Sequence, residues 1–104
     1  MRVPTPKAEL YRWHERAIRG EKVAYHHTPE CGFFVTRFVP RGSPIPASIS
    51  MRQVIDPVTG ELMEDETLEA EILGEPRDPD EVWMRTAKRP ICRLYYLELL
   101  GKLM

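Results

Sequence analysis

The feature that most constrains the fold is a pair of apolar, β-branched stretches separated by a proline-rich loop. The first stretch is Cys31–Val39 and the second is Ala47–Ile55. Between them, Pro40–Pro46 contains three prolines and one glycine. Each proline removes a backbone N–H donor, so this segment is expected to be a loop rather than part of a sheet. The pattern predicts two antiparallel strands joined by a stiff connection.

Two later segments extend the predicted sheet. Asp56–Gly60 has the composition of a tight turn, because it combines a proline with a final glycine. The acidic residues after it are expected to form an exposed loop. Apolar residues then alternate with glutamates over Leu68–Ile72, which predicts a half-buried strand. If this strand pairs with the second one, Arg52 should face Glu69 or Glu71.

Three helices are expected beside the sheet. The first should span Pro6–Arg19 with Trp13 in its buried stripe. The second should span Pro79–Ala87 and bury Trp83, and the third should span Ile91–Leu100. The buried face of the third helix is set by one of two groups of residues, either Leu94, Leu97 and Leu100 or Tyr95 and Leu99.

Together these elements predict one α+β domain over residues 1–104. Its sheet should have three to four antiparallel strands, either open or curled into a partial barrel. The N-terminal helix and the two C-terminal helices should pack against it. The chain has no apolar run long enough to span a bilayer, and its first residues lack the apolar stretch of a secretion signal. We therefore expect a cytoplasmic protein that does not bind membranes.

Charge is unevenly distributed along the chain. The net charge of −1 argues against a dedicated nucleic-acid-binding protein. Residues 1–41 carry a net charge of +4, residues 42–81 carry −9, and residues 82–104 carry +4. Either the basic ends neutralise the acidic middle within the fold, or the acidic middle forms a face that docks on a basic partner.

The residue types for metal or nucleophile chemistry are few. His26 and His27 lie near Cys31, with His14 and Cys92 as distant further ligands, but the tight paired spacing of zinc sites is missing. We therefore expect no metal, no cofactor and no catalytic residue. The two cysteines are expected to be free thiols.

Aromatic and basic residues are mixed around the proline-rich loop. They are Phe34, Arg37, Phe38, Arg41 and Arg52. Such a mixture is typical of a surface that stacks bases and binds phosphates. The alternative is that the phenylalanines belong to the core and that the arginines pair with nearby acids.

Several short motifs also resemble a known group of proteins. They are a helix bearing Trp13, Cys31–Phe34 with Arg37, Arg41–Ala47, Asp56–Glu61, Asp78–Trp83 and Arg89–Ile91. The pattern resembles a family of small, uncharacterised proteins encoded by tailed phages and prophages of Gram-negative bacteria. Members typically carry glycine and tryptophan where this chain has Ser43 and Ile45. The resemblance implies a phage context and brings no activity with it.

The sequence thus predicts a non-enzymatic phage accessory protein that binds a host protein or a component of a host defence system. A nucleic-acid-binding accessory protein is the alternative, and an enzyme comes third. A stiff loop loses little entropy on binding, so Arg37, Arg41, Arg52, Phe34 and Phe38 are the predicted partner-binding residues. The sequence leaves the oligomeric state open.

Overall fold

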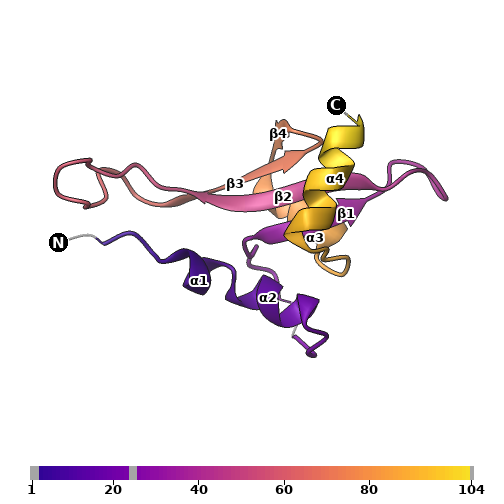
Figure 1. The fold of residues 1–104 in the computed structure, drawn as a ribbon, viewed down its shortest axis with the longest axis horizontal. Coiled ribbons are helices and arrows are strands. Elements are labelled where there is room, and N and C mark those ends of the chain that lie inside the picture. The colour runs from indigo at the N-terminus through magenta and orange to yellow at the C-terminus, as the bar shows by residue number, and fades with distance from the viewer. Residues whose placement is uncertain (1–2, 24–25, 104) are drawn as a thin grey trace.

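The computed structural model describes residues 3–23 and 26–103. Among them, one antiparallel sheet contains β1 (Gly32–Thr36), β2 (Ile45–Arg52), β3 (Thr67–Ile72) and β4 (Glu75–Arg77), in that spatial order (Figure 1). Consecutive strands are neighbours, so the sheet is an open meander rather than a partial barrel. The predicted α+β class is confirmed.

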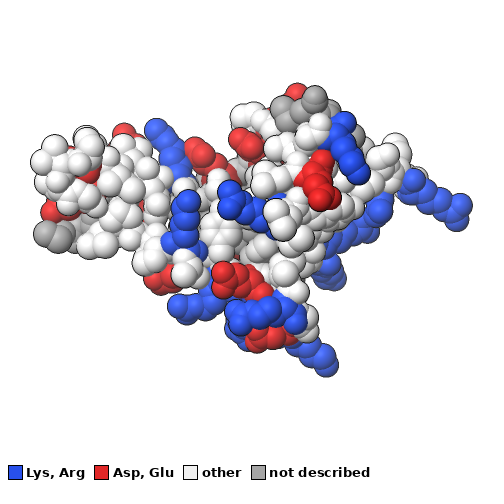
Figure 2. Space-filling view, viewed as in Figure 1, with Lys and Arg blue, Asp and Glu red and all other residues white. Residues whose placement is uncertain are grey.

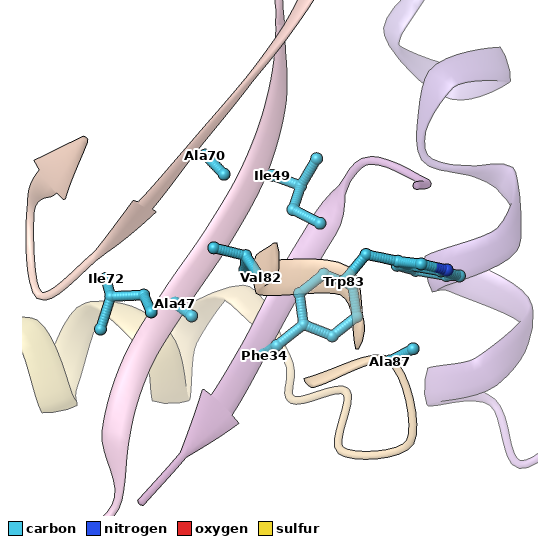
Figure 3. Packing of buried hydrophobic residues seen from close by; sticks show 8 residues of the cluster. All are labelled: Phe34, Ala47, Ile49, Ala70, Ile72, Val82, Trp83 and Ala87. Atoms are coloured by element: carbon cyan, nitrogen blue, oxygen red, sulfur yellow. The ribbon is translucent and has the colours of Figure 1, made fainter. Parts of the chain in front are cut away.

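One face of the sheet carries the hydrophobic core. It is built from Phe34 on β1, Ala47 and Ile49 on β2, and Ala70 and Ile72 on β3, all of them buried. The helix α3 (Pro79–Thr86) covers this face with Val82 and Trp83, as Figure 3 shows. The predicted cap of α3 is present, since the Asp78 carboxylate accepts a hydrogen bond from the backbone N–H of Asp80.

The opposite face is covered over β1 and β2 by α4 (Arg93–Leu103). The Tyr96 ring lies 4.9 Å from the Phe33 ring, and its hydroxyl lies 3.4 Å from the Ser48 hydroxyl. Tyr96 and Leu99 are the buried residues of α4, whereas Leu94 is 74% exposed. Both predicted inward faces were wrong in part, because neither included Tyr96 and one relied on Leu94.

The N-terminal helix is interrupted rather than continuous. It forms α1 (Lys7–Leu10) and α2 (Arg12–Ile18), which meet at Tyr11, where φ is −98° and ψ is 12°. After the interruption, α2 lies against β1. Tyr11 reaches Phe33 on one face of the sheet (5.9 Å between ring centroids), while Trp13 reaches Trp83 on the other (4.9 Å).

The segment 89–91 pairs with the outer edge of β1, which the sequence did not predict. The Val35 N–H donates to the Arg89 carbonyl (3.1 Å), and the Ile91 N–H donates to the Phe33 carbonyl (2.9 Å). The buried His14 ring donates from Nε2 to the Ile91 carbonyl (2.8 Å). These bonds satisfy the backbone groups that an edge strand otherwise leaves unpaired.

Close packing at this edge explains a glycine in β1. A Cβ atom added to Gly32 would lie 2.8 Å from Cδ2 of His14. A larger residue at position 32 would therefore force the His14 ring to move, which explains the glycine there.

The strand β4 was also missed. Leu73 and Gly74 both have positive φ (53° and 80°), which forms a two-residue hairpin between β3 and β4. Pro76 lies in the middle of β4, opposite Glu71. A proline suits an edge strand because its missing N–H faces away from the sheet.

Beyond the sheet, β2 and β3 continue as a hairpin that we call the arm (residues 53–66), at the left of Figure 1. Ile55 pairs with Leu62, and the predicted turn is present, with the Gly60 N–H donating to the Asp56 carbonyl (2.8 Å). At its base, the Glu66 carboxylate accepts hydrogen bonds from Thr5 and Gln53. The acidic segment that was predicted as an exposed loop forms one side of this hairpin.

Trp83 should dominate the stability of this fold, because its buried ring contacts Trp13 and Phe34. We expect Trp83→Ala to lower the free energy of unfolding by about 3–5 kcal/mol, measured by urea denaturation. Met84, its exposed neighbour on α3, provides the matched control: Met84→Ala should change stability by less than about 0.5 kcal/mol. Equal effects of the two substitutions would contradict this core assignment.

Candidate functional site

The connection between β1 and β2 is built around one tight turn. The Gly42 N–H donates to the Val39 carbonyl (3.0 Å), so residues 39–42 form a β-turn. Pro40 fixes a negative φ at the second position, and Arg41 has a φ of +60° at the third. These values define a type II turn, in which the third position is normally glycine or asparagine.

Arg41 thus occupies a backbone conformation that its side chain disfavours. A non-glycine residue in the left-handed region costs roughly 1–2 kcal/mol. Its side chain is exposed at the tip of the turn. Strain of this kind occurs in tight turns, as at Leu73 in the β3–β4 hairpin, and it also clusters at functional sites. Together with its exposure at the tip, it makes Arg41 a candidate binding residue.

The exposed side chain of Arg37 also holds this loop. Its Nε donates a hydrogen bond of 2.8 Å to the Gly42 carbonyl. The turn is therefore held by a backbone bond, a proline and a side-chain bond together. The positive charge of Arg37 remains at this end of the molecule.

Two further arginines join the loop from α3 and the segment after it. The Arg85 guanidinium lies over the Phe38 ring, 5.6 Å from its centroid, which is cation–π geometry. Arg89 lines a shallow groove of about 600 Å³ together with residues 37–42. We call this surface, formed by Arg37, Phe38, Val39, Arg41, Arg85 and Arg89, the cationic loop end. Figure 2 shows basic side chains at the end of the molecule where the β1–β2 loop lies.

The cationic loop end combines positive charge with exposed hydrocarbon. Phe38 is 52% exposed and Val39 is 61% exposed. None of the described residues that line the groove is acidic. Arg85 contacts Glu81 at 3.8 Å, an exposed pair that neutralises it little. The surface can therefore bind an anionic partner that also offers apolar contacts.

The structure corrects the prediction that Phe34 binds a partner. It is fully buried in the core against Trp83, 6.0 Å between ring centroids. The faces of a strand alternate, and Phe34 points to the face that α3 covers. It supports β1 from inside and cannot contact a partner in this fold.

The structure also corrects the prediction that Arg52 lies beside the loop. It lies at the far end of β2 from the loop, about 23 Å away at the usual rise per strand residue. Its guanidinium is 3.9 Å from the carboxylates of Glu64 and Glu69. The predicted contact with Glu69 is confirmed, and Arg52 belongs to the acidic side of the molecule.

Arg85 and Arg89 are the residues that sequence reasoning missed. They lie more than 40 positions after the loop, and a basic residue at the end of a helix is usually explained by the helix dipole. The pairing of 89–91 with β1 places Arg89 beside Arg37. No sequence pattern that we identified predicts that pairing.

The histidines and cysteines do not converge. Within residues 3–23 and 26–103, no three His, Cys, Asp or Glu side chains are placed to hold a metal ion. Cys31 is buried, and burial, with the carboxylates of Glu30 and Glu66, raises the pKa of its thiol to about 11. Cys92 is exposed at the start of α4.

Comparisons with known proteins found no match for this chain. No protein-family model matches it, and neither a curated protein nor a solved structure matches. Among the described residues, each helix is too short or too polar to cross a lipid bilayer.

The strain at Arg41 leads to a stability prediction. Arg41→Gly removes the steric cost of positive φ, which offsets the entropy that glycine adds to the unfolded chain. We expect the free energy of unfolding, measured in urea, to stay unchanged or rise by up to about 1 kcal/mol. Arg41→Val should lower it by about 1 kcal/mol or more, because a β-branched residue fits this conformation worst. A large loss from Arg41→Gly would mean that the arginine side chain stabilises the fold.

Proposed function

We propose that this protein acts by binding another protein, and that the cationic loop end contacts an acidic surface on that partner. The observation that carries the proposal is the arginine cluster around exposed Phe38 and Val39, mounted on a strained, braced turn. Arginine and aromatic residues are enriched at the energetic centres of protein interfaces.

Preorganisation supports this assignment. Pro40, the Val39–Gly42 backbone bond and the Arg37 side chain all fix the loop before any partner arrives. A fixed loop avoids the entropy cost of ordering on binding, which otherwise reduces affinity. These same contacts hold Arg41 in its strained conformation and keep its guanidinium at the tip.

The chemistry of the surface favours binding over catalysis. Guanidinium groups and hydrocarbon side chains line the groove, and neither acts as a nucleophile or as a general base near neutral pH. We accordingly assign the protein a non-enzymatic role. From the resemblance of its short motifs to phage and prophage proteins, we further propose that the partner is a host protein or a component of a host defence system.

Nucleic acid is the second candidate ligand, because the arginines of the cationic loop end also suit phosphates. A platform for single strands needs several exposed rings beside a continuous basic track. Here Phe34 is buried, and Arg52 lies among glutamates at the other end of β2. These two placements favour a protein partner.

The test is a pull-down from bacterial host lysate with tagged protein, followed by mass spectrometry. We expect Arg41→Glu to lower the affinity for the captured partner at least tenfold, with an unchanged melting temperature. Arg12→Glu is the matched control, because it makes the same charge change on the exposed start of α2. Capture should survive that substitution.

Intact capture by a destabilised Arg41→Glu variant would make the arginine a structural residue and overturn the proposal. Salt then separates the two ligand classes. A steep linear fall of log affinity with log salt concentration indicates nucleic acid, whereas a shallow dependence indicates a protein surface.

A further inference from the structure

We propose that two copies of this chain associate by placing the arm of each copy in the groove beside α1 and α2 of the other. The arm and this groove lie away from the cationic loop end, so the inference does not rest on the proposed function.

The arm is both apolar and acidic. Val58 at its tip is 89% exposed, and Met63 and Ile55 are 62% and 44% exposed. Residues 53–66 include five carboxylates and no lysine or arginine. Three of them also have partners within the chain: Glu64 lies 3.9 Å from Arg52, Glu66 accepts hydrogen bonds at the base of the arm, and Asp56 caps the turn. Exposed apolar groups on a projecting hairpin are typical of an interaction surface.

The arm is also ordered without a partner. Its two sides are joined by the Asp56 N–H to Glu61 carbonyl bond (2.9 Å) and the Met63 N–H to Val54 carbonyl bond (2.8 Å). The Asp56 carboxylate accepts from the Val58 N–H at 2.8 Å, which fixes the turn. The tip therefore presents its side chains in one arrangement, and little entropy is lost on docking.

The groove has the complementary character. It has a volume of about 720 Å³ and lies between α1, α2, β1 and the start of α4. Apolar and aromatic groups from Ala8, Tyr11, Ile18 and Phe33 line it. Lys7, Arg19 and Arg93 are its basic residues, and Glu15 is the single acid among the described residues that line it. Arg19 lies 3.8 Å from Glu15 and 3.9 Å from Glu21, so Lys7 and Arg93 supply most of the positive charge that the groove offers.

Charge and shape make a second copy the occupant that this structure supports. An acidic hairpin with an apolar tip matches a basic groove with apolar walls. In Figure 1 the tip of the arm lies to the left of α1 and away from α2, α3 and α4, and no arm residue lines the groove, so a chain does not fill its own groove.

Reciprocal exchange of arms closes the assembly as a two-fold dimer. Each copy then gives one arm and receives one. The cationic loop end stays free in this dimer, because it adjoins Ile45 at one end of β2 whereas the arm follows Arg52 at the other.

The first measurement is the molar mass in solution by analytical ultracentrifugation at low and high salt. We expect a dimer at low salt whose dissociation constant rises at least tenfold in 0.5 M salt, because screening weakens the charge pairing. Val58→Glu should abolish the dimer while leaving the melting temperature unchanged. A monomer at all accessible protein concentrations would overturn the proposal.

Charge exchange tests the pairing itself. Glu61→Lys on the arm and Arg93→Glu in the groove should each raise the dissociation constant at least tenfold. A carboxylate at position 93 is compatible with folding because it lies at the start of α4. An equimolar mixture of the two variants should restore the dimer, since both contacts again join opposite charges. Failure of the mixture to associate would contradict reciprocal exchange.

Cross-linking identifies the contact directly. Cys92 lines the groove and is exposed, whereas Cys31 is buried. With Val58→Cys, a short bismaleimide should join position 58 of one copy to Cys92 of another, seen as a dimer on a denaturing gel and mapped by mass spectrometry. Lys102→Cys, exposed at the other end of α4, is the control and should give no such link. A dimer that cross-links elsewhere, or an arm captured by another protein instead, would overturn the proposal.

Discussion

The pairing of residues 89–91 with the edge of β1 is the interaction on which the rest of the structure depends. Two backbone hydrogen bonds, from Val35 to Arg89 and from Ile91 to Phe33, join the C-terminal part of the chain to the first strand. Because α3 ends just before this segment and α4 begins just after it, the pairing also directs the two helices to opposite faces of the sheet. The His14 bond to the Ile91 carbonyl then ties α2 to the same edge.

Both candidate surfaces follow from that pairing. On one side it places Arg89, with Arg85 preceding it on α3, beside the loop that carries Arg41. On the other side it starts α4 next to α2, so Arg93 comes to line the groove with Tyr11. The charge differences seen along the chain thus become differences between surfaces, with basic groups at the loop end and in the groove and acidic groups on the arm.

The sequence predicted the features that depend on residues close together in the chain, such as helix caps, turns and strand alternation. Asp78 caps α3, the 56–60 segment turns, and Leu68–Ile72 alternates between faces, as expected from propensity and periodicity. The features that the sequence did not predict depend on contacts between residues far apart in the chain. Phe34 and Phe38 share one strand pattern, yet α3 buries the first while β1 ends before the second. Arg41 was identified because it lies at a proline-stiffened tip, whereas Arg85 and Arg89 required the fold to bring them there.

Amide hydrogen exchange followed by NMR tests this account most directly. If the edge pairing organises the molecule, the amides of Val35 and Ile91 should be protected to nearly the same degree as those in the centre of the sheet. Without it, both N–H groups would face solvent, because the N–H of Val35 does not bond to β2. Protection of both amides is the result we predict. Exchange of both at the rate of unpaired loop amides, while β2 and β3 stay protected, would contradict the account.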